Sequence, residues 1–268
     1  MKTQLIAALF VLLGLSSCHL AAPKKLELPV AKVKDTLLYT YNTLKQRAPD
    51  CGNKPDTECT VAQIEYPVFS GQKTLNDTVR KKLLNVFFSV ENGDTSLNKT
   101  LLGFIKSYDS SKNSTEPDMF YTLDLYAYVL NQDSSLATLA LGGYQFSGGA
   151  HGSTQRLFIN WDTKAKREIN LRDILIAGYK YQLTKVAEHL FRRQEKLSDT
   201  VSLADSYFFE NGKFRLNHNF SITPTGLNFL YNEYEIKPYS EGMTELLIPY
   251  SSIKSLLKTH TVVDQYIK

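Results

Sequence analysis

The sequence has few cysteines, a single tryptophan and little excess of charge of either sign. Its 268 residues include 31 basic and 27 acidic side chains, so the formal net charge is only +4. A balance this even does not produce the field that nucleic-acid binding needs, which excludes nucleic acid as the expected partner. The only long apolar run, residues 5–13, lies at the N-terminus, which excludes a protein with several membrane spans.

The composition is that of a globular protein. Apolar residues make up 43% of the chain, charged residues 22% and aromatic residues 12%, which excludes disorder and collagen. The length suffices for one large core or two small ones. We find no recognised catalytic motif in the sequence. We therefore expect no catalytic residue, no cofactor and no metal site, and a non-enzymatic role.

The N-terminus has the pattern of a bacterial lipoprotein signal. Lys2 gives a short positive region, residues 5–13 are apolar, and Leu15-Ser16-Ser17-Cys18 forms the cleavage site. Nine residues at about 1.5 Å each rise far less than the roughly 30 Å of a bilayer core. We expect residues 1–17 to be removed and Cys18 to carry acyl chains that anchor the protein. The alternative is a plain secretory signal with an incidental cysteine.

We expect a lipid-anchored protein of the cell envelope, in the outer membrane and facing the periplasm, because His19 and not aspartate follows the anchor. Residues 18–48 would form a tether and a segment with two interpretations. Leu37, Tyr41 and Leu44 would share one face of a helix, whereas Tyr39 and Thr40 favour a strand.

Two cysteines remain after lipidation, Cys51 and Cys59, in the loop CGNKPDTEC. In an exported protein two close cysteines are expected to form a disulfide. Gly52 and Pro55 let the chain turn back, and closing the loop stabilises by about 2 to 3 kcal/mol in the chain-entropy description. The alternative is a metal pair, but histidine is absent from the loop and the spacing does not match zinc ligands.

Apolar periodicity predicts an α+β fold. Strand-like runs are found over residues 60–69, 119–130, 134–146, 156–162 and 167–171. Four-residue spacing predicts a helix over 72–89, an apolar face predicts one over 179–196, and residues 97–106 are a further helix candidate. Pro67 indicates a sheet edge or a strand end. MTELLIPYSSIKSLL predicts a strand followed by a short helix capped by Ser251 or Ser252. Without regular βαβ alternation, we expect antiparallel sheets with two or three packed helices.

Three segments carry a resemblance to a known family. They are Gly142-Gly143-Tyr144 through GGAHG, NWD and INLRDIL (residues 142–175), FSITPTGLNFLYNEYEIKPYSEG (220–242) and LIPYSSIKSLL (247–257). Together they resemble the extracytoplasmic domain of the lysozyme-sensing anti-sigma factor RsiV and of the non-catalytic region of the peptidoglycan deacetylase PdaC. The resemblance implies a PdaC-like portion over 49–150 and an RsiV-like portion over 151–268. It also implies binding without turnover, with a lysozyme-like protein or the cell-wall glycan as partner.

Four residues are candidates for ligand contact: His151, Tyr231, Tyr234 and Tyr239. Tyrosine buries a large area at little entropic cost and keeps a hydroxyl for hydrogen bonding, which suits a contact surface. The alternative is that the tyrosines pack on a sheet and that His151 is a loop imidazole bonded to backbone. A cell-wall hydrolase or deacetylase using His151 as base is the competing class, and it needs a nucleophile and an orienting partner. A structural envelope protein is the third.

Overall fold

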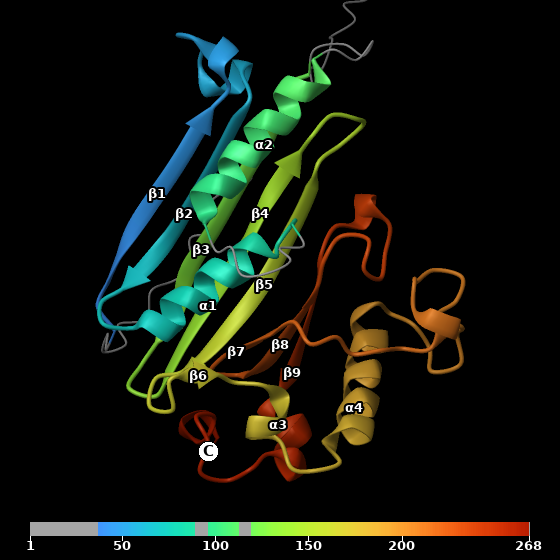
Figure 1. Cartoon of the computed structure of the whole chain (residues 1–268). Coiled ribbons are helices and arrows are strands. Elements are labelled where there is room, and N and C mark those ends of the chain that lie inside the picture. Colours follow the sequence, from blue (N-terminus) through green and yellow to red (C-terminus); the bar gives the residue numbers. More distant parts are fainter. Residues whose placement is uncertain (1–36, 89–95, 113–118, 268) are drawn as a thin grey trace, which may run out of the picture. The chain divides into compact units, whose positions relative to one another are not determined.

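Two β-sheets and three longer helices make up the structure, a computed structural model that describes residues 37–88, 96–112 and 119–267 (Figure 1). These residues belong to one unit, Lys32–Lys268. The predicted signal peptide, Cys18 and its tether lie outside the described residues. Within the described part of the chain, every helix is too short or too polar to cross a membrane.

The first sheet has six strands in the order β1-β2-β3-β4-β5-β6. Their bounds are β1 Tyr39–Arg47, β2 Val61–Phe69, β3 Thr122–Gln132, β4 Leu136–Phe146, β5 Ser153–Asp162 and β6 Arg167–Glu168. Strands β3 and β4 and strands β5 and β6 form the two predicted hairpins. The ambiguous segment before the cysteine loop is a strand, because all nine residues of β1 pair with β2.

One pair of strands departs from the predicted antiparallel arrangement. Strands β2 and β3 run parallel because helices α1 (Lys73–Leu84) and α2 (Leu97–Ser111) lie in the connection between them and return the chain to the same end of the sheet. Pro67 does not mark a sheet edge, since β2 lies between β1 and β3. Pro67 lies after Glu65, the last residue of β2 that pairs with β3.

The two helices cover one face of the first sheet (Figure 1). The four-residue spacing that predicts α1 places Leu75, Val79 and Leu83 in the core, each at most 1% exposed. Helix α2 begins after Ser96, whose hydroxyl accepts a hydrogen bond from the Lys99 amide. The core under these helices extends through the sheet strands as far as Trp161.

The second sheet has three antiparallel strands, in the order β7-β8-β9. Their bounds are β7 Phe220–Ile222, β8 Gly226–Tyr231 and β9 Thr244–Pro249, and the helices of this half are α3 Leu171–Ile174 and α4 Tyr179–Gln194. Helix α4 buries Leu183, Ala187 and Phe191 in the core of this half. The α+β class with packed helices is confirmed.

Short 3-10 helices complete the fold. They are η1 Pro49–Cys51, η2 Asp56–Glu58, η3 Glu210–Gly212, η4 Tyr239–Glu241, η5 Tyr250–Leu256 and η6 Asp264–Tyr266. The predicted capping of the helix after β9 by Ser251 or Ser252 is wrong. Helix η5 begins at Tyr250, directly after Pro249, and has no side-chain cap hydrogen bond.

The boundary predicted between residues 150 and 151 falls inside the first sheet, because β5 follows it and pairs with β4. The core changes further along the chain. Apart from Leu136, the buried residues of the second core begin at Ile169. The change therefore follows β6, where the chain leaves the first sheet.

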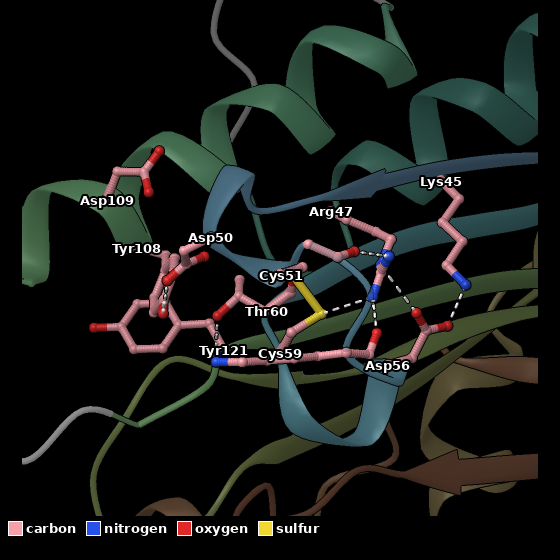
Figure 2. Close-up of a disulfide and its surroundings, with 12 residues drawn as sticks. Lys45, Arg47, Asp50, Cys51, Asp56, Cys59, Thr60, Tyr108, Asp109 and Tyr121 are labelled. Atoms are coloured by element: carbon pink, nitrogen blue, oxygen red, sulfur yellow. Dashed lines mark hydrogen bonds and ion pairs between the residues drawn. A yellow bond between two sulfur atoms is a disulfide. The ribbon is translucent and has the colours of Figure 1, made fainter.

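A disulfide joins Cys51 to Cys59, with their Cα atoms 5.3 Å apart and both residues buried (Figure 2). The Arg47 guanidinium organises the loop that the disulfide closes. Its Nη1 donates to the Gly52 carbonyl at 3.2 Å, and its Nη2 donates to the Lys54 carbonyl. The disulfide and the hydrogen bonds of Arg47 thus both restrain the loop.

We predict that the double variant Cys51→Ser, Cys59→Ser unfolds at a lower denaturant concentration. The disulfide joins two cysteines eight positions apart. Its loss should lower the free energy of unfolding by about 2 to 3 kcal/mol, because the unfolded chain regains the entropy of the open loop. Urea denaturation followed by circular dichroism measures the difference. Equal midpoints for the oxidised wild type and the double variant would contradict the structural role of the crosslink.

Candidate functional site

Three of the four candidate contact residues lie together in the structure. The Tyr239 ring stacks on the His151 imidazole, with centroids 4.2 Å apart and planes 13° apart. The Tyr234 hydroxyl lies 3.1 Å from His151 Nε2, and the Tyr234 and Tyr239 ring centroids are 5.7 Å apart. We refer to these three residues as the aromatic cluster.

The aromatic cluster is accessible from solvent. His151 is exposed, Tyr234 is 52% exposed and Tyr239 is half-buried. Aromatic side chains that are held together at a surface, instead of packing in a core, offer a preformed contact area to a ligand.

Both ring nitrogens of His151 have hydrogen-bond partners. Nδ1 lies 3.0 Å from the Gly152 carbonyl oxygen, which can only accept, so Nδ1 carries a proton. In the neutral imidazole Nε2 then accepts from the Tyr234 hydroxyl. Neither partner is a nucleophilic serine or an orienting carboxylate, and the contact with a backbone carbonyl matches the loop imidazole considered above.

Tyr231 does not join the aromatic cluster. It is 1% exposed, and its hydroxyl donates to the Arg215 carbonyl at 2.8 Å. It is the last residue of β8 and is still paired with Thr244 of β9, so its side chain packs in the second core. Burial raises the pKa of its phenol. Tyr231 therefore takes the alternative role, packing on the sheet, and is absent from the contact surface.

The aromatic cluster is held in place by a feature of β5 that the sequence does not reveal. Strand β6 pairs only with the last two residues of β5. Before them, side chains of the second half occupy the outer backbone edge of β5. The Thr154 amide donates to Glu233 at 3.0 Å, the Arg156 amide donates to Asn232 Oδ1 at 2.7 Å, and the Phe158 amide donates to Asn219 Oδ1 at 3.1 Å.

The same asparagines also donate to β5, and β5 in turn bonds the second sheet. Asn219 Nδ2 and Asn232 Nδ2 donate to the Arg156 carbonyl at 2.8 and 3.1 Å. Asn160, 2% exposed, donates to the Phe220 carbonyl and accepts from the Ile222 amide, both at 2.8 Å. We refer to the side-chain bonds of Asn160, Asn219, Asn232 and Glu233 as the β5 joint. It ties the two sheets together through backbone groups that would otherwise lack a strand partner.

The turn that carries Tyr234 follows directly from the β5 joint. Tyr234 has a φ of +62°, in the left-handed region that a bulky residue adopts only when its surroundings require it. Asn232 and Glu233 are fixed on β5, and the Asn232 amide donates to Glu235 at 2.8 Å. Because the chain on both sides of Tyr234 is held, its ring is directed to the loop that contains His151.

Two further residues support the aromatic cluster, Tyr144 and Gly152. A Cβ atom on Gly152 would lie only 2.4 Å from the Tyr144 ring, so glycine is needed for this close approach. Burial raises the pKa of the Tyr144 phenol, and the neighbouring Tyr239 and Glu233 raise it further. The signal in the sequence is the motif Gly142-Gly143-Tyr144, which carries the family resemblance without indicating which residues Tyr144 meets.

Three acidic residues lie close in sequence to the tyrosines of the aromatic cluster. Glu235 and Glu241 are exposed, and Glu233 is half-buried. The nearby Lys237 does not offset them freely, because its ammonium pairs with Glu195 at 2.7 Å. The segment that carries Tyr234 and Tyr239 is therefore both aromatic and acidic. In the part of the chain that the structure describes, groups of three or more His, Cys, Asp or Glu side chains suited to a metal ion are absent.

Comparisons with known proteins identify both halves. Residues 53–154 match the family model described as "Deacetylase PdaC", and residues 172–251 match the model described as "Protein of unknown function (DUF3298)". The chain thus has a PdaC-like portion followed by a portion similar to DUF3298. The resemblance to PdaC read from the sequence is thereby confirmed, and the two portions indicate an extracytoplasmic protein of the cell envelope.

The curated relatives are longer than the matched region. The chain is 23% identical over 212 residues to the peptidoglycan-N-acetylmuramic acid deacetylase PdaC of Bacillus subtilis, a match that covers 76% of this chain and 39% of that protein. It is 30% identical over 115 residues to the immunogenic protein MPT64 of Mycobacterium tuberculosis, covering 42% of this chain and 49% of that protein. The chain thus spans less than half the length of either relative.

Solved structures share the fold. A DUF3298 family protein from Pseudomonas aeruginosa matches with a TM-score of 0.68 and 25% identity, covering 84% of this chain and 96% of that one. A DUF3298 family member from Bacteroides fragilis matches with a TM-score of 0.68 and 21% identity, covering 88% and 99%. In this chain His151 belongs to the PdaC-like match and Tyr234 and Tyr239 to the DUF3298 match, so both portions contribute to the aromatic cluster.

We predict that Asn160→Ala destabilises the fold strongly. The substitution leaves the Phe220 carbonyl and the Ile222 amide buried without partners, which should cost about 2 to 4 kcal/mol. Asn42→Ala, at an exposed position of β1, is the matched control and should change stability by less than about 0.5 kcal/mol. Equal denaturation midpoints for the two variants would show that the β5 joint contributes nothing.

Proposed function

We propose that this protein is a non-enzymatic, lipid-anchored binding module of the cell envelope, in the outer membrane and facing the periplasm. Its contact surface is the aromatic cluster, and its partner is a basic protein of the lysozyme type. The observation that carries the proposal is the exposed stack of His151, Tyr234 and Tyr239, which both family portions build and the β5 joint holds in a fixed conformation.

The chemistry of the surface favours a protein partner. Tyrosine and histidine rings that are already ordered lose little entropy on binding, and such residues dominate the binding energy of protein interfaces. The Tyr234 hydroxyl holds the His151 imidazole in place, so the rings are ordered before a partner binds. The aromatic cluster therefore has the composition of an interface centre.

Charge supports a basic partner. The segment that carries Tyr234 and Tyr239 also contains the exposed Glu235 and Glu241, and complementary charge raises association rates and selects among partners. The attraction is local, since the whole sequence carries a net charge of only +4. The attraction should act only over short distances and should be weakened by added salt. It should not depend on the net charge of the whole protein.

Two observations favour the cell-wall glycan as a second candidate partner. The nearly parallel stack of Tyr239 on His151 presents a flat aromatic surface, of the kind on which a sugar ring can lie. In addition, the relative from Bacillus subtilis is by its name a deacetylase of peptidoglycan. A glycan strand is thus the alternative that the binding experiment must include.

The hydrogen bonds of His151 support binding over turnover. A hydrolase or deacetylase using this imidazole as base requires a nucleophile within reach, whereas its two nitrogens face a backbone carbonyl and a phenol. A purely structural envelope protein does not require exposed aromatic rings in a fixed arrangement. The site is therefore better suited to contact with a ligand.

We predict that Tyr239→Ala weakens binding to lysozyme by about tenfold or more, because it removes the ring that stacks on His151. Tyr181→Ala is the matched control, since Tyr181 is 64% exposed on α4 and distant in sequence from the aromatic cluster. Surface plasmon resonance on immobilised lysozyme, together with a pull-down on purified peptidoglycan, measures both candidate partners.

The outcomes separate the hypotheses. Loss of lysozyme binding in Tyr239→Ala but not in Tyr181→Ala supports the proposal. If the protein binds peptidoglycan but not lysozyme, and Tyr239→Ala weakens that binding, the partner is the glycan and not a protein. Turnover of peptidoglycan that disappears in His151→Ala would overturn the non-enzymatic role.

A further inference from the structure

The face of the first sheet that α1 and α2 leave uncovered carries tyrosines and carboxylates. Leu123, Leu125 and Ala127 of β3 are fully buried in the core under the helices. Because side chains alternate along a strand, Asp124, Tyr126 and Tyr128 lie on the opposite face. We refer to Tyr41, Glu65, Asp124, Tyr126 and Tyr128 as the open-face cluster.

The rings of the open-face cluster are ordered against one another. Tyr126 and Tyr128 are stacked, with centroids 5.1 Å and planes 14° apart, and the Tyr41 ring lies 6.1 Å from that of Tyr128. A Cβ atom on Gly142 would lie 2.9 Å from the Tyr126 hydroxyl, so the glycine makes room for this ring on the neighbouring strand. The glycine pair of the family motif thus also positions a tyrosine of the uncovered face.

The two carboxylates of the open-face cluster are neighbours in the sheet. Gln63 pairs with Asp124 and Glu65 with Tyr126 in the parallel register, which makes Glu65 and Asp124 diagonal neighbours on one face. The Tyr128 hydroxyl donates to Glu65 at 3.0 Å. Burial raises the pKa of the Asp124 carboxyl and the charge of Glu65 raises it further, whereas a hydrogen bond with Gln63 lowers it.

Cationic side chains of the same face are paired with other acids. The Lys45 ammonium pairs with Asp56, and the Arg156 guanidinium lies 3.4 Å from Glu245. Negative charge on the open-face cluster is therefore left without a cation from Lys45 or Arg156. An added cation would relieve the repulsion between Glu65 and Asp124 and could also lie against the tyrosine rings.

We propose that the open-face cluster is a second binding site, which takes a lysine or arginine side chain of a polypeptide partner. The tyrosine rings contact the cationic group and its apolar stem, and Glu65 and Asp124 supply the opposite charge. A polypeptide is favoured over a free amine, because Tyr41 at the outer part of this face is 43% exposed and a small ligand would bury too little area there. The open-face cluster shares no residue with the aromatic cluster.

A labelled synthetic peptide of alternating lysine and glycine residues tests this inference on the full-length protein. Fluorescence anisotropy at low salt should show binding that the double variant Glu65→Gln, Asp124→Asn weakens by about tenfold. Tyr128→Leu should weaken it by about fivefold through loss of the ring. The control variant Asp199→Asn, Asp205→Asn, at two exposed carboxylates of the second half, should leave affinity within about twofold.

Three results would overturn the inference. The lysine peptide fails to bind at low salt, it binds the double variant as tightly as the wild type, or a peptide with glutamine in place of lysine binds equally well. Binding of a peptidoglycan fragment that depends on Tyr128, without binding of the lysine peptide, would make the face a saccharide site and also overturn it. If the double variant does not fold, the single variants Glu65→Gln and Tyr41→Ala carry the same test, Tyr41 being 43% exposed.

Discussion

The outer backbone edge of β5 is the constraint on which the arrangement of the molecule depends. Over residues 154–158 this edge has no strand partner in the described sheets, and backbone groups that are removed from water must find partners or cost free energy. Asparagine and glutamate side chains from distant segments supply those partners. The edge is thereby protected from pairing with another chain, and the second sheet is fixed to the first.

The same bonds determine where the candidate contact surface forms. Asn232 and Glu233 follow β8, and their side chains accept hydrogen bonds from backbone amides of β5. Tyr234 is the next residue along the chain. The loop with His151 immediately precedes β5. The loop with His151 and the turn with Tyr234 are about 80 residues apart in the sequence. They meet because the edge of β5 binds the side chains that precede Tyr234, and the contact of the rings follows from this.

Local patterns in the sequence were sufficient for most elements. Four-residue spacing identified α1, an apolar face identified α4, and strand-like runs identified the hairpin of β3 and β4, because these signals report which face of an element is buried. Pairing partners are not contained in such a signal. The parallel register of β2 and β3 was missed for this reason, since the alternation of each strand is the same in either direction.

The candidate site shows the same limit. The exposure of Tyr234 and the partial exposure of Tyr239 fit the turn chemistry of Pro238 and Gly242, which the sequence shows. The burial of Tyr231 depends on how far β8 continues its pairing with β9, and the sequence spacing of Tyr231, Tyr234 and Tyr239 does not reveal it. The bonds of Asn219 and Asn232 to β5 span 61 and 76 positions, beyond the reach of any local rule.

Amide hydrogen exchange of β5 tests the central claim most directly. The Arg156 and Phe158 amides should be protected in the wild type, although neither has a strand partner on its side of β5. In Asn232→Ala the Arg156 amide should exchange faster while the Phe158 amide, held by Asn219, keeps its protection. Rapid exchange of both amides in the wild-type protein would contradict the account.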